Sequence, residues 1–528
     1  MVFIKSIFLG QNTCLITNMF ITRKKAFYET KKFLLISILF FVLVNLGMAQ
    51  SIPHFSLPNG ADIVAGKVQV EYLGNKMQIN QFSPKAAIRW NEFNVGKDAS
   101  VEFLQPNPAS SILNQVSNKD PSFILGNVSS NGNVFITNGN GIFFGKNATV
   151  DVGGMVASTL EIKLDDYINE KFSFIGSKNS ANIVNEGSLS STTGGYVALL
   201  ASDVRNSGII TAKKGSVFLA SGERVELKFS EKSNLEGVRV AASDWKALVE
   251  NKHVIEAEEG LVILSANAKR ALRGGVVNNS GRIAAQGILR KGGRIILTAD
   301  ENGEVSNSGS IDASSKGGKG GVISMEGRKL LIDSNSIADV SGNKGGGVFL
   351  AGGDWQGGKN PANESLLSSF QMKEAVEVTM KKDALINASA GQNGDGGKVV
   401  LWSDINNIDS ITSVSGNIYS HGGTYGGNGG MVETSGRKLA INDAFVSTLA
   451  NDGETGQWLL DPGDIDITSS GTVTSLYYSY VPSENTSIQT SAIESALNSN
   501  NLTIQTGSGG HYINVTDPIN FTNNSSRK

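Results

Sequence analysis

The residues able to donate protons or bind metals are few and widely spaced in this chain of 528 residues. The four histidines lie no closer than 90 residues apart, so they do not form the local His-x-x-x-His spacing of a zinc site. They are His54, His253, His421 and His511. We expect each histidine to be a surface residue, and the sequence predicts no metal site made from them.

A short stretch, Gly353 to Lys359, fits the G-x-x-x-x-G-K spacing of a loop that cradles phosphate with backbone N–H groups. Two neighbouring residues argue against this chemistry. Asn360 follows where such a loop has Ser or Thr, and Pro361 cannot lie inside the helix that should come next. The sequence therefore predicts no cofactor bound at this stretch.

Three carboxylates, Asp461, Asp464 and Asp466, lie close together in the stretch LDPGDIDI. Carboxylates at this spacing could bind Ca²⁺, but the twelve-residue loop with its final Glu is missing. We expect a turn with solvated carboxylates. No residue then remains as a candidate for catalysis, cofactor binding or metal binding.

The elements that would have to position any site are set by an internal repeat with two parts. The first part is Asn-x-Gly-x followed by Leu or Ile, with Asn at positions 185, 206, 279 and 307. The second part is a Gly followed by apolar alternation, with Gly at positions 195, 293, 321, 347, 397 and 430. The stretch GGVISMEGRKLLID (320–333) also aligns without gaps to GGMVETSGRKLAIN (429–442), 109 residues later, which suggests five units of about 22 residues.

A short strand between Asn and Gly corners is not stable alone, so successive units must stack, each strand pairing in parallel with its copy one turn later. The predicted fold is all-β: a right-handed parallel β-helix, or solenoid, with an N-terminal cap. Asn residues at equivalent corners are expected to stack amide on amide. We expect residues 243–260 to form a short helix that interrupts the coil and residues 355–382 to loop out. A β-sandwich stays open as the alternative.

A β-helix can carry an active site, because paired acids on its flank can hydrolyse or eliminate glycans. Such a site needs acids, Arg and aromatic side chains gathered on one face. Here acids and aromatics are dispersed along the sequence. The sequence therefore predicts that the protein is not an enzyme, and a glycan-degrading lyase or glycosidase is the alternative.

The first 49 residues predict a secretory signal peptide. Five basic residues between positions 23 and 32 precede the apolar run FLLISILFFVLVNL, and small residues lead to a cleavage site after Ala49. Either Met1 or Met19 can be the start of translation. An uncleaved membrane anchor is the alternative.

Removal of this leader changes the charge and the cysteine content. The leader holds six of the 46 Lys and Arg and one of the 48 Asp and Glu, so 40 and 47 remain and the net charge becomes −7. An acidic balance argues against nucleic acid as a partner. The one cysteine, Cys14, lies in the leader, so we expect a secreted chain without disulfides.

Four stretches near the start of the expected mature chain carry a family likeness. They read LPNGADIVAGKVQV (57–70), INQFSPKAAIRWNEFNVG (79–96), FLQPNPASSILNQV (103–116) and DPSFILGNVSSNGNVFITNGNGIFFGKNATVDVGGMVASTLEI (120–162). In their order, spacing and residue identities, they resemble the filamentous-haemagglutinin-type secretion domain of two-partner-secreted exoproteins. Later stretches such as GGDWQGGKNP (352–361) and TGQWLLDPGDIDI (455–467) resemble the high-molecular-weight adhesin branch of that family.

The resemblance implies an export route. After the inner membrane is crossed, a dedicated outer-membrane β-barrel transporter with periplasmic docking domains recognises the unfolded secretion domain. The chain is expected to thread outward, to fold at the surface of a double-membraned bacterium, and to act there or after release as an adhesin or haemagglutinin-like protein. The expected partners are the transporter and a host-cell or glycan receptor.

The resemblance also places recognition residues on this sequence. Transporter recognition is expected at Asn114, Asn138, Asn140, Gly141 and Ile142. The same residues can instead be simple corner and core positions of the coil, and both interpretations stay open. The family usually has Asn-Pro-Asn-Gly-Ile where this chain has Gly139, so the corner lacks the fixed φ of Pro and is expected to be looser.

We expect four segments along the chain. They are the signal peptide at 1–49 with an extended basic region, the two-partner-secretion domain at 50–175, a β-helical repeat stalk at 176–467, and a Ser/Thr/Asn-rich segment at 468–528 that begins further repeats. Large adhesins of this branch usually continue for many more repeats. A truncated, non-functional adhesin remnant is therefore a further interpretation.

Overall fold

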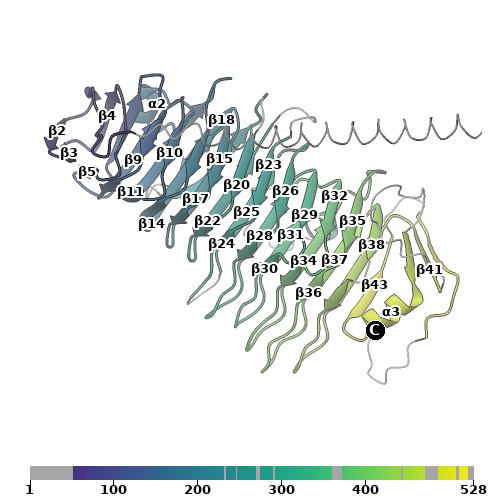
Figure 1. Ribbon diagram of the computed structural model, residues 1–528. Helices are drawn as coiled ribbons and strands as arrows, with labels where there is room; N and C mark the ends of the chain where they lie inside the picture. Colours follow the sequence, from purple (N-terminus) through teal and green to yellow (C-terminus); the bar gives the residue numbers. More distant parts are fainter. Residues whose placement is uncertain are drawn as a thin grey trace, which may run out of the picture. The chain divides into compact units, whose positions relative to one another are not determined.

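The computed structural model describes residues 52–230, 234–244, 247–268, 274–288, 292–358, 372–441, 444–469, 486–506 and 511–520. The chain divides into two units, Met1–Pro53 and His54–Lys528. The predicted signal peptide and its cleavage site at Ala49 lie outside the described residues. The second unit is a parallel β-helix (Figure 1), which confirms the predicted fold class.

Stacked strands form three faces of the coil, here named A, B and C. β11 (Thr149–Ser158) and β14 (Ser188–Ala201) run through both face B and face A and join these faces into one sheet. The other strands of face A are β4 (Lys85–Trp90), β6 (Ser111–Val116), β9 (Asn133–Thr137), β17 (Ser216–Ser221), β22 (Leu261–Ala266), β25 (Arg294–Ala299), β28 (Val322–Glu326), β31 (Val348–Ala351), β34 (Lys398–Trp402), β37 (Met431–Gly436), β40 (Gln457–Pro462) and β43 (Asn501–Ile504).

The strands of faces B and C are equally short. Those of face B are β3 (Lys76–Gln81), β5 (Ser100–Leu104), β8 (Asn127–Ser130), β16 (Ile209–Thr211), β21 (Val254–Glu256), β24 (Arg282–Ala284), β27 (Ser310–Asp312), β30 (Ile337–Asp339), β33 (Leu385–Asn387), β36 (Asn417–Tyr419) and β39 (Phe445–Ser447). Those of face C are β7 (Ser122–Ile124), β10 (Ile142–Phe144), β13 (Ile183–Asn185), β15 (Asp203–Asn206), β20 (Leu248–Asn251), β23 (Val276–Asn279), β26 (Glu304–Asn307), β29 (Lys329–Ile332), β32 (Glu377–Met380), β35 (Ile411–Val414) and β38 (Lys438–Ile441).

Each turn of the coil passes through face C, then face B, then face A, and each strand pairs in parallel with its equivalent in the next turn. The inward side chains of one turn therefore lie directly on those of the next. On face C, Ile183, Val204 and Val249 form such a column, and all three are fully buried. One continuous apolar core results, which is what strands of three to six residues need for stability.

A column of buried asparagines runs beside this apolar column. Its five members occupy the last position of successive face C strands: Asn185, Asn206, Asn251, Asn279 and Asn307. Each side-chain Nδ2 donates to the Oδ1 of the next asparagine, over distances of 2.8, 2.8, 2.7 and 2.7 Å. This asparagine ladder confirms the predicted amide stacking, and it satisfies polar groups that would otherwise be orphaned in the core.

A column of glycines stands at the corner that leads into face A. It contains Gly153, Gly195, Gly215, Gly260, Gly293, Gly321, Gly347, Gly397, Gly430 and Gly456. A Cβ added at Gly347, for example, would lie 2.2 Å from the carbonyl oxygen of Gly321 in the preceding turn. The Gly-apolar half of the repeat therefore marks a corner where successive turns approach too closely for any side chain.

The N-terminal end of the coil is closed by antiparallel strands, as the predicted cap requires. β1 (Asp62–Ala65) pairs antiparallel with β4, and β2 (Val68–Leu73) pairs antiparallel with β3. At the other end, β41 (Ile465–Thr468), β42 (Thr486–Gln489) and β44 (Ile513–Val515) form a small parallel sheet beside helix α3 (Thr490–Leu497).

The predicted helical interruption exists, but at a different place. Helix α2 (Leu164–Ile168) interrupts the coil between β11 and β14, together with β12 (Ser173–Ile175). The expectation of a helix at 243–260 is wrong, because this stretch supplies the coil strands β20 and β21. Trp245, part of the pattern behind that expectation, lies outside the described residues. The coil is interrupted just before, by the antiparallel hairpin of β18 (Arg224–Phe229) and β19 (Leu235–Ala241).

The expectation that residues 355–382 loop out holds only in part. Trp355–Gly358 form a short 3₁₀ turn outside the strands, but Glu377–Met380 form β32 and belong to face C. Residues 359–371 lie outside the described residues.

The turns are less regular than the sequence suggested. Equivalent asparagines of the ladder are 21, 45, 28 and 28 residues apart, because hairpins and loops extend some turns. The expectation of five units between the two aligned stretches is also wrong. Val322 of β28 reaches its equivalent, Met431 of β37, through β31 and β34, which makes three turns.

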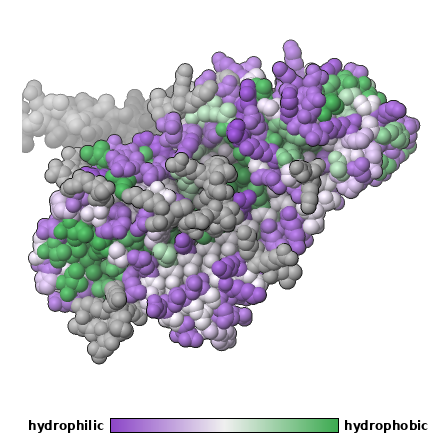
Figure 2. All heavy atoms as spheres, turned by 180° about the vertical axis from the view of Figure 1, so that it is seen from behind, coloured by the Kyte–Doolittle hydropathy of each residue, from purple (hydrophilic) through white to green (hydrophobic). Residues whose placement is uncertain are grey.

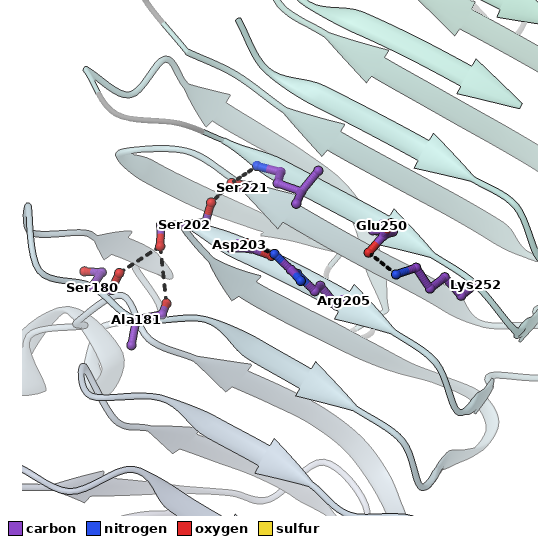
Figure 3. Close-up of polar contacts among 9 residues, drawn as sticks. Ser180, Ala181, Ser202, Asp203, Arg205, Ser221, Glu250 and Lys252 are labelled. Atoms are coloured by element: carbon purple, nitrogen blue, oxygen red, sulfur yellow. Dashed lines mark hydrogen bonds and ion pairs between the residues drawn. The ribbon is translucent and has the colours of Figure 1, made fainter. Parts of the chain in front are cut away.

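Serine hydroxyls bridge successive turns at the corner between faces A and C (Figure 3). Ser202 Oγ donates to the carbonyl oxygen of Ser180, and Ser221 Oγ donates to that of Ser202, each over 2.7 Å. On the adjoining outer surface, Asp203 holds Arg205 through two hydrogen bonds of 2.8 and 2.9 Å, which raise the pKa of the Arg205 guanidinium. The two serine hydrogen bonds link successive turns at this corner, as the asparagine ladder does in the core.

A buried carboxyl holds the 3₁₀ turn against face A. Glu433 of β37 is fully buried, and its Oε2 accepts the backbone N–H of Gln356 at 2.8 Å while Ser435 Oγ donates to its Oε1 at 2.9 Å. Burial raises the pKa of Glu433 from 4.5 to about 7. The folded protein therefore takes up a proton here between these pH values, so the stability contributed by the protonated group is present at low pH and is lost as the pH rises through about 7.

Replacing Glu433 by Gln should remove this dependence, because the amide is uncharged, its oxygen can accept the N–H of Gln356, and its Nε2 can donate to Ser435 Oγ. We expect the variant to be more stable than the wild type by about 2–3 kcal/mol at pH 8 and nearly equal to it at pH 4.5. Urea unfolding followed by circular dichroism at several pH values measures the difference. Glu301→Gln, at an exposed position, is the matched control. An equal effect of Glu433→Gln at both pH values would contradict the assignment.

Candidate functional site

Three of the five predicted recognition residues, Asn138, Asn140 and Gly141, lie in one tight turn between β9 and β10, and Ile142 is the first residue of β10. The backbone N–H of Gly141 donates to the carbonyl oxygen of Asn138 at 3.1 Å, which closes a β-turn over residues 138–141. The Oδ1 of Asn138 accepts the backbone N–H of Asn140 at 2.9 Å, so the side chain repeats the turn's own hydrogen bond. Gly141 has φ +122°, a conformation that favours glycine.

Side chains of this turn fasten it to the preceding turn of the coil. The Nδ2 of Asn138 donates to the carbonyl oxygen of Asp120 at 2.9 Å and to Ser122 Oγ at 3.0 Å. The Nδ2 of Asn140 donates to the carbonyl oxygen of Asn118 at 2.9 Å. Asn138 is buried and Asn140 is exposed, so the two asparagines fix the turn from the inside and from the outside.

The fifth residue, Asn114, lies apart from this turn, inside face A on β6. It is fully buried. Its Oδ1 accepts the indole N–H of Trp90 at 2.9 Å, and its Nδ2 donates to the carbonyl oxygen of Phe135 at 3.1 Å. Asn114 therefore connects three successive strands, β4, β6 and β9.

The burial of three of these residues limits how a partner could contact them. Asn114, Asn138 and Ile142 are each no more than 2% exposed, so a partner cannot read their side chains from the folded coil. Their hydrogen bonds also give them a structural role as corner and core residues. A role in transporter recognition, which stays a prediction, would therefore require contact with the chain before it folds.

Gly139 occupies the second position of this turn, where the family usually has Pro. An added Cβ would meet only the carbonyl oxygen of Thr159, at 3.9 Å. Pro is favoured at this position of a type I turn because its φ matches.

Gly139→Pro should therefore stabilise the folded protein by about 0.5–1 kcal/mol, mainly by restricting the unfolded chain. The midpoint of urea unfolding, compared with that of Gly139→Ala, measures the gain that the proline ring adds. A lower midpoint for the Pro variant would show that the backbone here does not suit a proline.

An aromatic cluster outside the coil was not predicted. Helix α2 and the β18–β19 hairpin cover the outer side of face A, where Phe172 stacks on Phe135 and contacts Phe229, at ring distances of 5.6 and 4.7 Å. Tyr167 of α2 is buried, which raises its pKa, and its hydroxyl lies 2.7 Å from Ser111 Oγ. The spacing of Leu164, Tyr167 and Ile168, at i, i+3 and i+4, was the available sequence signal for this helix.

The residues first considered for chemistry do not gather into one site. Among the described residues, no group of three or more His, Cys, Asp or Glu could hold a metal ion. His54 is exposed as expected, but His421 is half-buried, with its Nε2 2.7 Å from Ser447 Oγ. His511 also departs from a surface position, since its side chain is only 18% exposed and its Nδ1 lies 3.0 Å from Asp464 Oδ1.

The expectation of solvated carboxylates at 461–466 is wrong for Asp461 and for Asp464, the side chain of which is only 17% exposed. Asp461 is 5% exposed at the end of face A, where its Oδ2 accepts a hydrogen bond from Nε2 of Gln505 at 2.7 Å.

Gly353, in the stretch considered as a phosphate loop, lies against the Trp402 ring, and a Cβ added there would meet the ring closely. Of the stretch considered as a phosphate loop, Lys359 lies outside the described residues. The helices that the structure describes include none that is long and apolar enough to cross a membrane.

Known proteins resemble parts of this chain. A family model described as the TPS secretion domain, where TPS stands for two-partner secretion, matches residues 49–313. A heme/hemopexin-binding protein of Haemophilus influenzae is 30% identical over 257 residues, which is 46% of this chain and 27% of that protein. A second protein of the same description from Haemophilus influenzae is 27% identical over 274 residues, 47% of this chain and 29% of that protein.

The crystal structure of the HMW1 secretion domain from Haemophilus influenzae superposes on this coil with a TM-score of 0.65. The two share 30% sequence identity, and the match covers 76% of this chain and all of the solved chain. The match to the curated relatives thus spans little more than a quarter of their length, whereas the match to the solved secretion domain spans the whole of that solved chain.

Proposed function

The chain belongs to the TPS secretion-domain family, and from that premise we propose that an outer-membrane transporter takes up its secretion domain unfolded and that the coil folds after export. Family membership makes the protein a two-partner-secretion exoprotein and implies a cognate transporter in the outer membrane. Proteins of this family pass through the periplasm to the cell surface or beyond. The family is one of adhesin-type exoproteins and is not known for enzymes.

The observation that best supports uptake of an unfolded chain is the burial of three of the predicted recognition residues. Asn114, Asn138 and Ile142 are enclosed by strands of neighbouring turns, so they become accessible only when those strands separate. The coil also lends itself to folding on the far side of the membrane, because each turn contacts mainly its neighbours and can add to turns already formed. Without cysteine beyond Cys14, the secreted part carries no cross-link that would block a pore.

Adhesion is a finer proposal and concerns the coil beyond the secretion domain. Two relatives are described as heme/hemopexin-binding proteins, but their similarity to this chain covers only 27% and 29% of their lengths. Because less than a third of each relative is matched, their ligand is not carried over. We assign export to the matched residues 49–313 and the display of a receptor-binding surface to the turns that follow.

Export through a transporter is tested by expressing the protein in a bacterium with an outer membrane, with and without the transporter of a related system. We expect the protein in the medium or on the surface only when the transporter is present. An Asn138→Ala variant should be exported several-fold less. Asn131→Ala, at the exposed corner before β9, is the control. Equal export with and without the transporter would overturn the proposal.

A further inference from the structure

The first strand pair of the cap leaves one edge of the coil open. β2 forms a hairpin with β3 through the two residues Gly74 and Asn75, so Leu73 and Lys76 are a hydrogen-bonded pair. At the other end of the pair, Phe82 N–H donates to the carbonyl oxygen of Lys67 at 2.8 Å, as expected if every second pair from Leu73 and Lys76 is hydrogen-bonded. Because hydrogen-bonded and non-bonded positions alternate, the backbone N–H and C=O groups of Val68, Val70 and Tyr72 point away from β3.

No strand among the described residues pairs with this outer edge of β2. β2 also covers the end of the apolar core incompletely. Val68 and Val70 pack against the end of the apolar core but are only partly buried, and the side chains that follow them, Tyr72 and Leu73, are 54% and 53% exposed. In Figure 2, green apolar side chains lie among purple ones at the right-hand end, which carries the first strands. An unpaired edge beside exposed apolar side chains is a template for another strand.

We propose that the strand which pairs with this edge is β2 of a second copy of this chain, related by a two-fold axis through Val70. The two strands would run antiparallel. Val70 would lie opposite Val70 of the other copy, and Val68 opposite Tyr72, so that the outward backbone groups of all three residues form about six hydrogen bonds across the interface. Face B would then continue from one copy into the other, end to end.

The sequence of β2 is complementary to itself in this register. Gln69 of one copy lies opposite Glu71 of the other, and no two like charges face each other. The same pair of side chains already bonds within one copy, where Gln69 Nε2 donates to Glu71 Oε1 at 2.8 Å. The remaining opposed pairs, Val70 with Val70 and Val68 with Tyr72, combine β-branched and aromatic side chains, which stabilise cross-strand contacts.

The first test is the oligomeric state of the purified secreted protein, measured by sedimentation over a range of concentrations. We expect a dimer in the wild type and a dissociation constant raised at least tenfold in Val70→Pro, which removes an outward N–H. Val70→Ala keeps that N–H and is the matched control, expected to weaken the dimer less. Melting curves of the three proteins show whether the cap stays folded. A wild type that is monomeric at the highest concentration would overturn the proposal.

Charge variants keep the proposal testable if the Pro variant fails to fold. Gln69→Glu should weaken the dimer several-fold, because it places two carboxylates opposite each other, and the double variant Gln69→Glu with Glu71→Lys should restore it.

Cysteine variants test the register, since the secreted part has no other cysteine. A mixture of Gln69→Cys and Glu71→Cys should oxidise to a cross-linked dimer, and each variant alone should not. Equal cross-linking of each variant alone would contradict the register.

Discussion

Gly347→Ala should destabilise the folded protein by about 3 kcal/mol or more, because the new Cβ would lie 2.2 Å from the carbonyl oxygen of Gly321. The atom it meets is backbone, which cannot rotate away as a flexible side chain can. β31 would have to separate from β28, and both strands belong to the core-forming face A. The expected result is a large fall in the urea midpoint and a loss of protease resistance that begins in the turns around residue 347.

Gly139→Ala is the matched control for this substitution, since its Cβ has only one neighbour, at 3.9 Å. We expect its stability to stay within about 0.5 kcal/mol of the wild type or to rise slightly. If Gly347→Ala were as stable as Gly139→Ala, the close approach of turns at the glycine column would not exist in solution.

Asn251→Ala should cost about 2–4 kcal/mol, the second large effect. Asn251 is the middle member of the asparagine ladder, accepting from Asn206 at 2.8 Å and donating to Asn279 at 2.7 Å. Its removal leaves an amide donor on one side and an acceptor on the other, both in the core, and opens a cavity between them. Urea unfolding measures the loss.

Position within the ladder gives this prediction a graded control. Asn185→Ala, at the end of the ladder, breaks one bond to a neighbouring asparagine and should cost less than Asn251→Ala. Asn278→Ala lies next to the ladder on β23 but on the outer side of face C, and should cost less than about 1 kcal/mol. Equal losses at positions 185, 251 and 278 would mean that the amides do not act as a connected ladder.

The parts of the fold that follow from a repeated local rule were predictable from the sequence. The Asn-x-Gly motif marks the ladder at Asn185, Asn206, Asn279 and Asn307, and the structure adds Asn251, which the motif misses because His253 stands in the place of Gly. The Gly-apolar motif marks the corner into face A in the same way. In both cases stacking in register makes one side chain, or the lack of one, necessary at every turn.

The parts that could not be predicted lie where the chain leaves the coil. Helix α2 has only five residues. The β18–β19 hairpin and the 3₁₀ turn interrupt the repeat, for which the sequence suggested a constant length. Glu433 points outward from its strand, so the sequence suggests a solvated acid, but the 3₁₀ turn at Gln356 covers it. These features depend on contacts between segments far apart in sequence, for which a repeat carries no signal.

Asn114 and the turn at Asn138 were predicted either as recognition residues or as corner and core positions, and the structure shows that Asn114 and Asn138 are buried. Their identity came from family resemblance, whereas their hydrogen bonds to Trp90, Phe135 and Asp120 come from neighbouring turns. Burial makes the structural role and the recognition role compatible in only one order. A side chain enclosed in the folded coil can contact a transporter only before the coil folds. The order of recognition and folding is therefore the central claim.

Export of a cross-linked secretion domain tests this order most directly. Asp151 of β11 and Ser190 of β14 are paired neighbours in adjacent turns, and Ser190 Oγ lies 3.3 Å from Asp151 Oδ1, so cysteines at both positions can form a disulfide. The oxidising periplasm closes this bond before export and leaves residues 151–190 as a covalently closed loop. With a functioning transporter, we expect the double-cysteine variant to stay in the periplasm under oxidising conditions and to be exported when a reductant is added, as each single-cysteine variant is throughout. Export of the disulfide-bonded protein in amounts equal to the reduced protein would contradict passage of an unfolded chain.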